Sequence, residues 1–222
     1  MIFLDYERNI AGEYYLAGVS DGGDVSQIVL NEKLRGLAVH HSFQITTPFT
    51  FTYELLNEAV KKKDVIAAYS SAEKNYINEI LSSNRSEFRD VEYLDMRKAA
   101  VRWANKYYYE QFNALPPLVA NASEYEQARH RNSLASISRL IPNPAPKVYA
   151  IGHTTQRFNQ VISALELRNQ NYENLTHVQK GKATKALKHN NFDVSAMLKL
   201  YNRIKGDNET IIEKATSPLF EH

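Results

Sequence analysis

Three short stretches rich in branched and aromatic residues open the chain, at residues 2–6, 13–19 and 25–31. Each has the length and composition of a β-strand, and the four residues 21–24, Asp-Gly-Gly-Asp, are a strong turn signal between the last two. The pattern predicts an antiparallel meander of three strands at the start of the fold.

Helix and strand patterns alternate after this meander. Apolar residues recur at helical spacing in residues 48–63 and again in 72–82, and the continuous apolar run 64–70 lies between them. Such a run between two helices is typical of a buried parallel strand. A strand at 91–94 and a helix at 95–109 repeat the alternation. The sequence therefore predicts an α/β fold, in which helices flank a mixed sheet made of the antiparallel meander and parallel strands.

The hydrophobic pattern is weaker over residues 110–175, where prolines cluster in the strings ALPPL and IPNPAP. Residues 133–141 favour a helix, and we interpret the remainder as an irregular cap or insertion. Residues 177–205 then carry the clearest helical pattern, with Thr176 suited to cap its start. Two consecutive asparagines at 190–191 favour turns and mark a possible break in this helix.

The composition narrows the class of protein but does not change the predicted fold. The chain has 222 residues, 43% of them hydrophobic and 23% charged, which suits a single globular domain. We expect residues 1–205 to form that domain and residues 206–222 to be an exposed C-terminal tail. The absence of cysteine excludes disulfides and thiolate metal sites and suits a reducing cytoplasm.

Nothing in the sequence indicates a membrane protein or a secreted one. No apolar run approaches the ~18 residues that a spanning helix needs, so we expect no membrane span. No basic-then-apolar leader precedes the first strand, so we also expect no secretory signal and a cytoplasmic location.

Two acids follow the first hydrophobic strand directly. Strand alternation places Asp5 and Glu7 on the same face. Like charges at this spacing repel each other, and burying either one is costly unless a positive group is near. A hard divalent cation meets that need, because it takes carboxylate oxygens as ligands. The alternative is a pair of surface acids on an edge strand.

Three later acids lie at the ends of predicted elements. Glu73 follows the buried strand and falls in the first turn of the next helix, where it either caps the helix or joins a ligand site at the sheet edge. Asp95 ends the next strand, and a helix cap is the favoured interpretation. Asp193 lies one helical turn after His189, so the two share a face if the helix is continuous. Otherwise Asp193 sits in the first turn of a new helix.

These residues resemble a known set. The string FLDYE at the N-terminal meander, an acid after the fourth strand and an Asp in a C-terminal helix resemble the DEDD superfamily of 3′–5′ exonucleases, which has a ribonuclease-H-like fold. The strings NSLASISRLI and LTHVQKGKATKALKHNNFDVSAMLKLY are similar to a branch of predicted ribonuclease-H-like exonucleases, in which an SLK-like helix and a final HN..DV helix recur. The similarity spans roughly residues 2–204.

The resemblance implies a set of site residues. Asp5 and Glu7 would form the first motif, Glu73 the second and Asp193 the last acid. All four would be ligands of two Mg²⁺ or Mn²⁺ ions ~3.5–4 Å apart. His189 would act as the general base. Glu73 stands where the family usually has Asp, and His189 has the spacing at which one subgroup carries Tyr.

The implied function is metal-dependent hydrolysis of phosphodiester bonds from the 3′ end of single-stranded DNA or RNA. Residues 177–205 carry seven basic residues against one acid. Their first four lysines are expected to contact the nucleic acid: Lys180, Lys182, Lys185 and Lys188. A solvated helix face is the alternative explanation of these lysines. Two other functions stay open: a structure-selective endonuclease on the same fold, and a nucleic-acid-binding module without activity.

Overall fold

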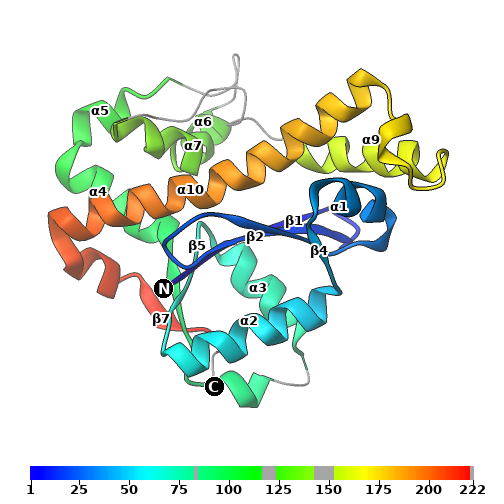
Figure 1. Ribbon diagram of the computed structural model, residues 1–222. Coiled ribbons are helices and arrows are strands. Elements are labelled where there is room, and N and C mark those ends of the chain that lie inside the picture. The colour runs from blue at the N-terminus through cyan, green and yellow to red at the C-terminus, as the bar shows by residue number, and fades with distance from the viewer. Residues whose placement is uncertain (83–84, 117–123, 143–152, 221–222) are drawn as a thin grey trace.

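The structure, a computed structural model, describes residues 1–82, 85–116, 124–142 and 153–220. Its strands form one seven-stranded mixed sheet in the order β4-β3-β2-β1-β5-β6-β7 (Figure 1). They are β1 (Ile2–Arg8), β2 (Tyr14–Ser20), β3 (Ser26–Val29), β4 (Gln44–Ile45), β5 (Ile66–Ala68), β6 (Glu92–Asp95) and β7 (Thr216–Pro218). The protein is therefore α/β with a mixed sheet, as the sequence predicts.

Helices cover both faces of this sheet. α2 (Pro48–Lys62) and α3 (Ser71–Ile80) pack on one face, and α4 (Met96–Tyr107) and the long α10 (His177–Glu213) pack on the other (Figure 1). The helices predicted at 48–63 and 72–82 are thus confirmed. No helix of the described ranges is long and apolar enough to cross a membrane.

The register of β1 decides which side chains reach the site. β1 pairs antiparallel with β2, so that Asp5 lies opposite Gly18, and it pairs in parallel with β5. Leu4 packs in the core under α2, whereas Phe3 packs in the core under α4 and α10. Because alternate residues share a face, Asp5 and Glu7 point to the same side as Phe3, toward α10. The predicted meander and the shared face of the two acids are confirmed.

The region 110–175 holds more helix than its sequence pattern predicts. It includes α9 (Thr154–Glu166), which packs along α10 and buries Phe158, Val161 and Leu165. An irregular cap is therefore the wrong description of α9, whose helical spacing follows two proline-rich segments that make the whole region look irregular. The segments 117–123 and 143–152 of the expected cap lie outside the described residues.

The remaining helices are short. The helix expected at 133–141 is α7 (Leu134–Ile137) followed by the 3₁₀ turn η3 (Ser138–Leu140). The α-helices are α1 (Arg35–His41), α5 (Tyr109–Asn113), α6 (Glu124–Arg131) and α7 (Leu134–Ile137). The 3₁₀ turns are η1 (Glu32–Leu34), η2 (Arg85–Phe88), η3 (Ser138–Leu140) and η4 (Tyr172–Asn174).

The C-terminal residues contradict the expected exposed tail. α10 continues to Glu213, with non-helical backbone at Asn208, and β7 then pairs antiparallel with β6. Leu219 and Phe220 are buried in the core below α2 and α3. The tail is ordered because its apolar side chains complete the core and its backbone closes the sheet edge.

Candidate active site

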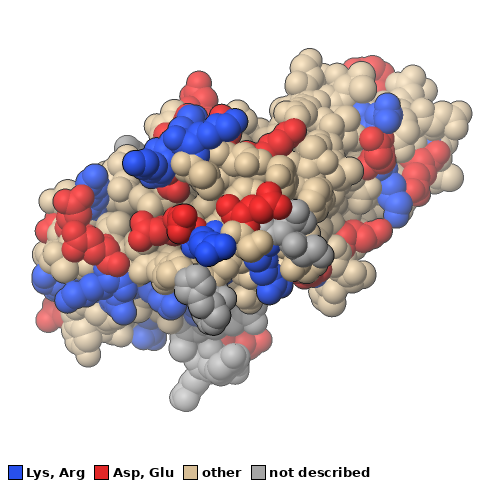
Figure 2. Space-filling model, turned by 90° about the horizontal axis from the view of Figure 1, so that it is seen from below, with Lys and Arg blue, Asp and Glu red and all other residues tan. Residues whose placement is uncertain are grey.

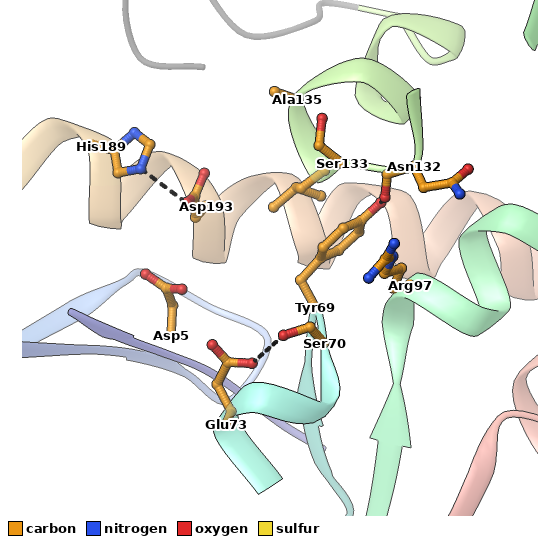
Figure 3. Close-up of a pocket in the computed structure, with 11 residues that line it drawn as sticks. Asp5, Tyr69, Ser70, Glu73, Arg97, Asn132, Ser133, Ala135, His189 and Asp193 are labelled. Atoms are coloured by element: carbon orange, nitrogen blue, oxygen red, sulfur yellow. Dashed lines mark hydrogen bonds and ion pairs between the residues drawn. The ribbon is translucent and has the colours of Figure 1, made fainter. Parts of the chain in front are cut away.

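A cavity of about 350 Å³ opens where the sheet meets α10, and it collects most of the predicted site residues (Figure 3). Asp5 enters from β1, Glu73 from the first turn of α3, and His189 and Asp193 from α10. Glu7 lies two residues further along β1 and does not line the cavity itself. The structure therefore brings together acids from three elements that are distant in sequence.

Asp5 is fixed by Asn190. The Asn190 Nδ2 donates hydrogen bonds to Asp5 Oδ2 at 2.8 Å and to the Asp5 main-chain oxygen at 3.2 Å. Asn190 is completely buried, and its Oδ1 accepts a hydrogen bond from Gln27 Nε2 at 3.0 Å. The asparagine that the sequence marks as a possible helix break instead joins α10 to β1 and β3, and the helix is continuous through it.

Gly18 makes this close approach of α10 possible. A Cβ atom at residue 18 would lie 2.4 Å from Asn190 Oδ1 and 2.9 Å from Val194 Cγ2. Real Cβ contacts are longer than either distance. Glycine opposite Asp5 is therefore a packing requirement of the site.

Glu73 has both of the roles that the sequence leaves open, in the first turn of a helix and in the candidate site. Ser70 is the N-cap of α3 and accepts a hydrogen bond from Ala72 N at 3.1 Å, while its hydroxyl lies 3.0 Å from Glu73 Oε2. Glu73 thus belongs to the start of the helix and also lines the cavity, with 8% of its surface exposed. Asp95, by contrast, caps α4 by accepting from Lys98 N at 3.0 Å, which confirms its interpretation as a helix cap.

His189 and Asp193 lie on successive turns of α10. The His189 Nε2 is 3.4 Å from Asp193 Oδ2, and both side chains are largely buried. The shared face predicted for them is confirmed, and the alternative of a new helix starting at residue 190 or 191 is wrong.

Burial sets the electrostatics of the carboxylates. Desolvation raises the pKa of Asp5 to about 6, against the hydrogen bond from Asn190. Desolvation, reinforced by the charge of Asp5, raises the pKa of Glu73 to about 8. The same two causes hold the pKa of Asp193 well above its usual range. The site therefore gathers carboxyl groups whose charged forms are disfavoured by partial burial and by one another.

Glu7 belongs to the same electrostatic group. Its pKa is held well above the usual range by burial first and then by the charges of Asp5, Asp193 and Glu73. Arg157 on α9 opposes these effects. The Arg157 Nη1 is buried without a hydrogen-bond partner, and no ion pair joins Arg157 to Glu7 among the described residues.

The oxygen atoms of the site are suitable ligands for a hard divalent cation, but their positions do not yet form a coordination shell. All four acids offer oxygen ligands, which Mg²⁺ and Mn²⁺ prefer, and their raised pKa values indicate missing positive charge. Within the described ranges, however, no group of three or more His, Asp or Glu side chains is already assembled as a metal site. Metal ligands in this cavity would have to move toward a bound cation.

The four lysines expected to bind nucleic acid differ in their surroundings, and Lys182 is half-buried. Lys180 pairs with Glu173 at 2.8 Å and lies over the Tyr172 ring, whereas Lys185 and Lys188 are exposed. On the side of the molecule where α2 lies, acidic and basic side chains are interspersed (Figure 2). On that side of the molecule, charge alone does not mark a path for nucleic acid.

Several cavity residues are missed by the sequence pattern. Tyr69, Arg97 and Asn132 also line the cavity, and Figure 3 shows Arg97 on the far side of Tyr69 from Asp5. Arg97 carries the one available signal, because a cation in the first turn of a helix opposes the helix dipole. The roles of Tyr69 and Asn132 depend on contacts that only the fold creates.

The fold and the cavity define an α/β protein with a mixed seven-stranded sheet and a group of buried carboxylates beneath its longest helix. Comparisons with protein-family models, with curated proteins and with solved structures found no match for the chain.

Proposed function

We propose that the protein is a metal-dependent 3′–5′ exonuclease of ribonuclease-H-like fold, acting on single-stranded ends of DNA or RNA. The observation that carries this proposal is the convergence of Asp5, Glu73 and Asp193 on one cavity, with Glu7 beside them. Buried like charges destabilise a fold unless a bound cation or substrate uses them, so such clusters mark functional sites. The meander beside parallel strands, crossed by the helix that carries the last acid, agrees with the fold that the resemblance implies.

In this proposal the acids bind metal and His189 transfers a proton. Asp5, Glu7, Glu73 and Asp193 would hold two Mg²⁺ or Mn²⁺ ions, which when bound supply a water of lowered pKa and neutralise charge on the phosphate. His189 would accept the proton of the attacking water, since an imidazole is the usual group for this transfer. Its 3.4 Å contact with Asp193 orients the ring toward the cavity. The absence of cysteine agrees with work in a reducing cytoplasm.

A second candidate is a nucleic-acid-binding module without hydrolytic activity. The specific observation in its favour is that no three ligand groups of the described residues are assembled as a metal site. Binding that persists in chelator, without hydrolysis in Mg²⁺ or Mn²⁺, would favour this candidate.

The test is degradation of a 5′-labelled single strand in Mn²⁺. The wild type should shorten the strand from its 3′ end, and a blocked 3′ end should stop it, because only an endonuclease cuts inside a blocked strand. Asp5→Asn and Asp193→Asn should each lower the rate more than about 100-fold, since even partners behind the metal ligands cost about 10–100-fold when lost. The exposed acid Asp24 provides the control Asp24→Asn, which should cleave as the wild type does. Activity that survives either cavity substitution would contradict the proposal.

A further inference from the structure

The cavity has two chemically different sides. Asp5, Glu73, His189 and Asp193 occupy one side, and Arg97, Asn132 and Ser133 lie toward the other, with Tyr69 between them (Figure 3). The Tyr69 hydroxyl donates a hydrogen bond to the Asn132 main-chain oxygen at 3.0 Å, which ties the end of β5 to the start of α7. The second side is therefore a built wall of the same cavity.

Arg97 has no partner within this wall. Its guanidinium makes no hydrogen bond or ion pair with another described residue. Burial raises the pKa of Tyr69 well above its usual range, and the nearby charge of Arg97 opposes that shift only in part. The neighbouring cations are engaged: Lys98 Nζ lies 3.6 Å from Asp95 Oδ2, and Arg102 Nη1 donates to the Lys214 main-chain oxygen at 2.6 Å. Of these three cations, Arg97 is the one that lines the cavity, where it is exposed to solvent and forms no ion pair with a described residue.

The position of Arg97 costs free energy in the chain alone. It falls in the first turn of α4, which contains no acid, and a cation there opposes the helix dipole. It gains nothing in return from the carboxylates of the cavity, with which it forms no ion pair. An anionic ligand on this side of the cavity would turn this unfavourable placement of a cation into a favourable one.

Asn132 is the second polar residue of the wall, and it is partly exposed to solvent. Its main-chain oxygen accepts from Tyr69, but its side-chain amide has no hydrogen-bond partner in the described part of the structure. A fork-shaped guanidinium beside a free amide matches a phosphate that is joined to a sugar, because the guanidinium binds phosphate oxygens in pairs and the amide can pair with a hydroxyl or a base edge.

We infer that Arg97 holds a non-scissile phosphate of a nucleic-acid strand whose scissile phosphate lies at the carboxylates, and that Asn132 contacts the nucleotide beside it. This inference rests on the proposed function for the identity of the scissile phosphate. Arg97 is here a substrate-binding residue on the wall opposite the carboxylates. It would position the strand end without taking part in proton transfer.

The test compares Arg97→Ala with Lys98→Ala, which removes the same charge from the adjacent residue outside the cavity. Arg97→Ala should raise KM for a single-stranded oligonucleotide in Mn²⁺ about tenfold or more, with a smaller change in kcat. A plot of the logarithm of the binding constant against the logarithm of salt concentration should also become less steep, by the ~0.7 expected for one lost phosphate contact to a single strand. Lys98→Ala should leave both quantities near their wild-type values.

A substrate series with one neutral methylphosphonate at each phosphate near the 3′ end identifies the contact. At one position the substitution should weaken the wild type and remove the difference between wild type and Arg97→Ala. The inference is overturned if Arg97→Ala behaves as Lys98→Ala does, or if its defect persists with every substrate in the series. Absence of hydrolysis by the wild type would instead contradict the proposed function. In that case, the affinity for the oligonucleotide measured in chelator tests Arg97 separately. A tenfold loss of affinity in Arg97→Ala supports the inference, and an affinity equal to that of Lys98→Ala overturns it.

Discussion

Glu73 serves both the fold and the site. Its place in the first turn of α3, beside the capping Ser70, is favourable for helix formation. Its burial near Asp5 is unfavourable, and the raised pKa of about 8 measures that conflict. A residue with a structural role alone could keep its carboxylate in water, as the exposed Glu54 of α2 does. The conflict at Glu73 is therefore the mark of a site.

This conflict predicts how stability depends on pH in the metal-free protein. Below about pH 4.5 Glu73 is protonated in both the folded and the unfolded chain, so its contribution is fully present. As the pH rises from about 4.5 to about 8, the unfolded chain releases the proton and the folded protein keeps it, so stability falls. The loss amounts to as much as roughly 5 kcal/mol, at about 1.4 kcal/mol for each unit of pKa shift.

Glu73→Gln should remove this part of the pH dependence, because glutamine does not titrate. Urea unfolding in chelator at about pH 5 and about pH 8.5 measures it: the variant should gain stability over the wild type at the higher pH. Glu54→Gln, at an exposed site in α2, is the matched control and should change neither value. An equal pH dependence in wild type and Glu73→Gln would show that the Glu73 carboxylate is not desolvated as described.

The site residues differ in how far the sequence could reveal them. Asp5 and Asp193 stand out because each is an acid beside apolar neighbours in a regular element. Asn190 does not, since a lone asparagine favours turns unless tertiary hydrogen bonds satisfy it, and its partners Asp5 and Gln27 are 185 and 163 residues away in the chain. Distance in sequence hides such contacts.

At the scale of elements, the contact of α10 with β1 and β2 decides where His189 and Asp193 lie. The helix rests on Gly18, and Asn190 and Val194 fill the space that a side chain there would need. The height of α10 above the sheet, and with it the width of the cavity, is thus set by the absence of one Cβ atom.

Gly18→Ala should push α10 away from the sheet. We expect a loss of about 1–3 kcal/mol in stability from overpacking, together with lower activity because His189 and Asp193 move with the helix. Thermal unfolding and the degradation assay measure the two effects. Gly181→Ala is the matched control on α10: nothing lies within 4 Å of its added Cβ, and alanine should stabilise the helix by about 0.5–1 kcal/mol. A Gly18→Ala protein as stable as the wild type would contradict the packing described here.

The predicted helices and strands agree with the structure where a strong hydrophobic period and a local capping residue occur together. α2 has both, with Thr47 and Pro48 at its start, and its predicted bounds are nearly right. α9 has a helical period but no side-chain cap, and the three residues of β7 are too few to show a period. The order of α9 comes from burial against α10, and that of β7 from pairing with β6 and from the burial of Leu219. Propensity could not reveal them, because tertiary contacts supply most of their stability.

At the scale of the whole molecule, the mixed sheet acts as a platform on which distant parts of the chain meet. β1 supplies Asp5, the crossover after β5 supplies Glu73, and α10 returns over the sheet with Asp193. The C-terminal β7 then closes the edge beside β6. The sheet positions the carboxylates on one side of the cavity, and α4 and α7 form the wall that carries Arg97 and Asn132.

The central claim is that these acids form one divalent-cation site, and anomalous diffraction from crystals soaked in Mn²⁺ tests it most directly. We expect anomalous density in the cavity, within about 2.0–2.3 Å of carboxylate oxygens of Asp5 and Asp193, and its loss in Asp5→Asn. Glu7 and Glu73 should turn toward the same density. Crystals that take up millimolar Mn²⁺ with no anomalous density at Asp5 would contradict the account.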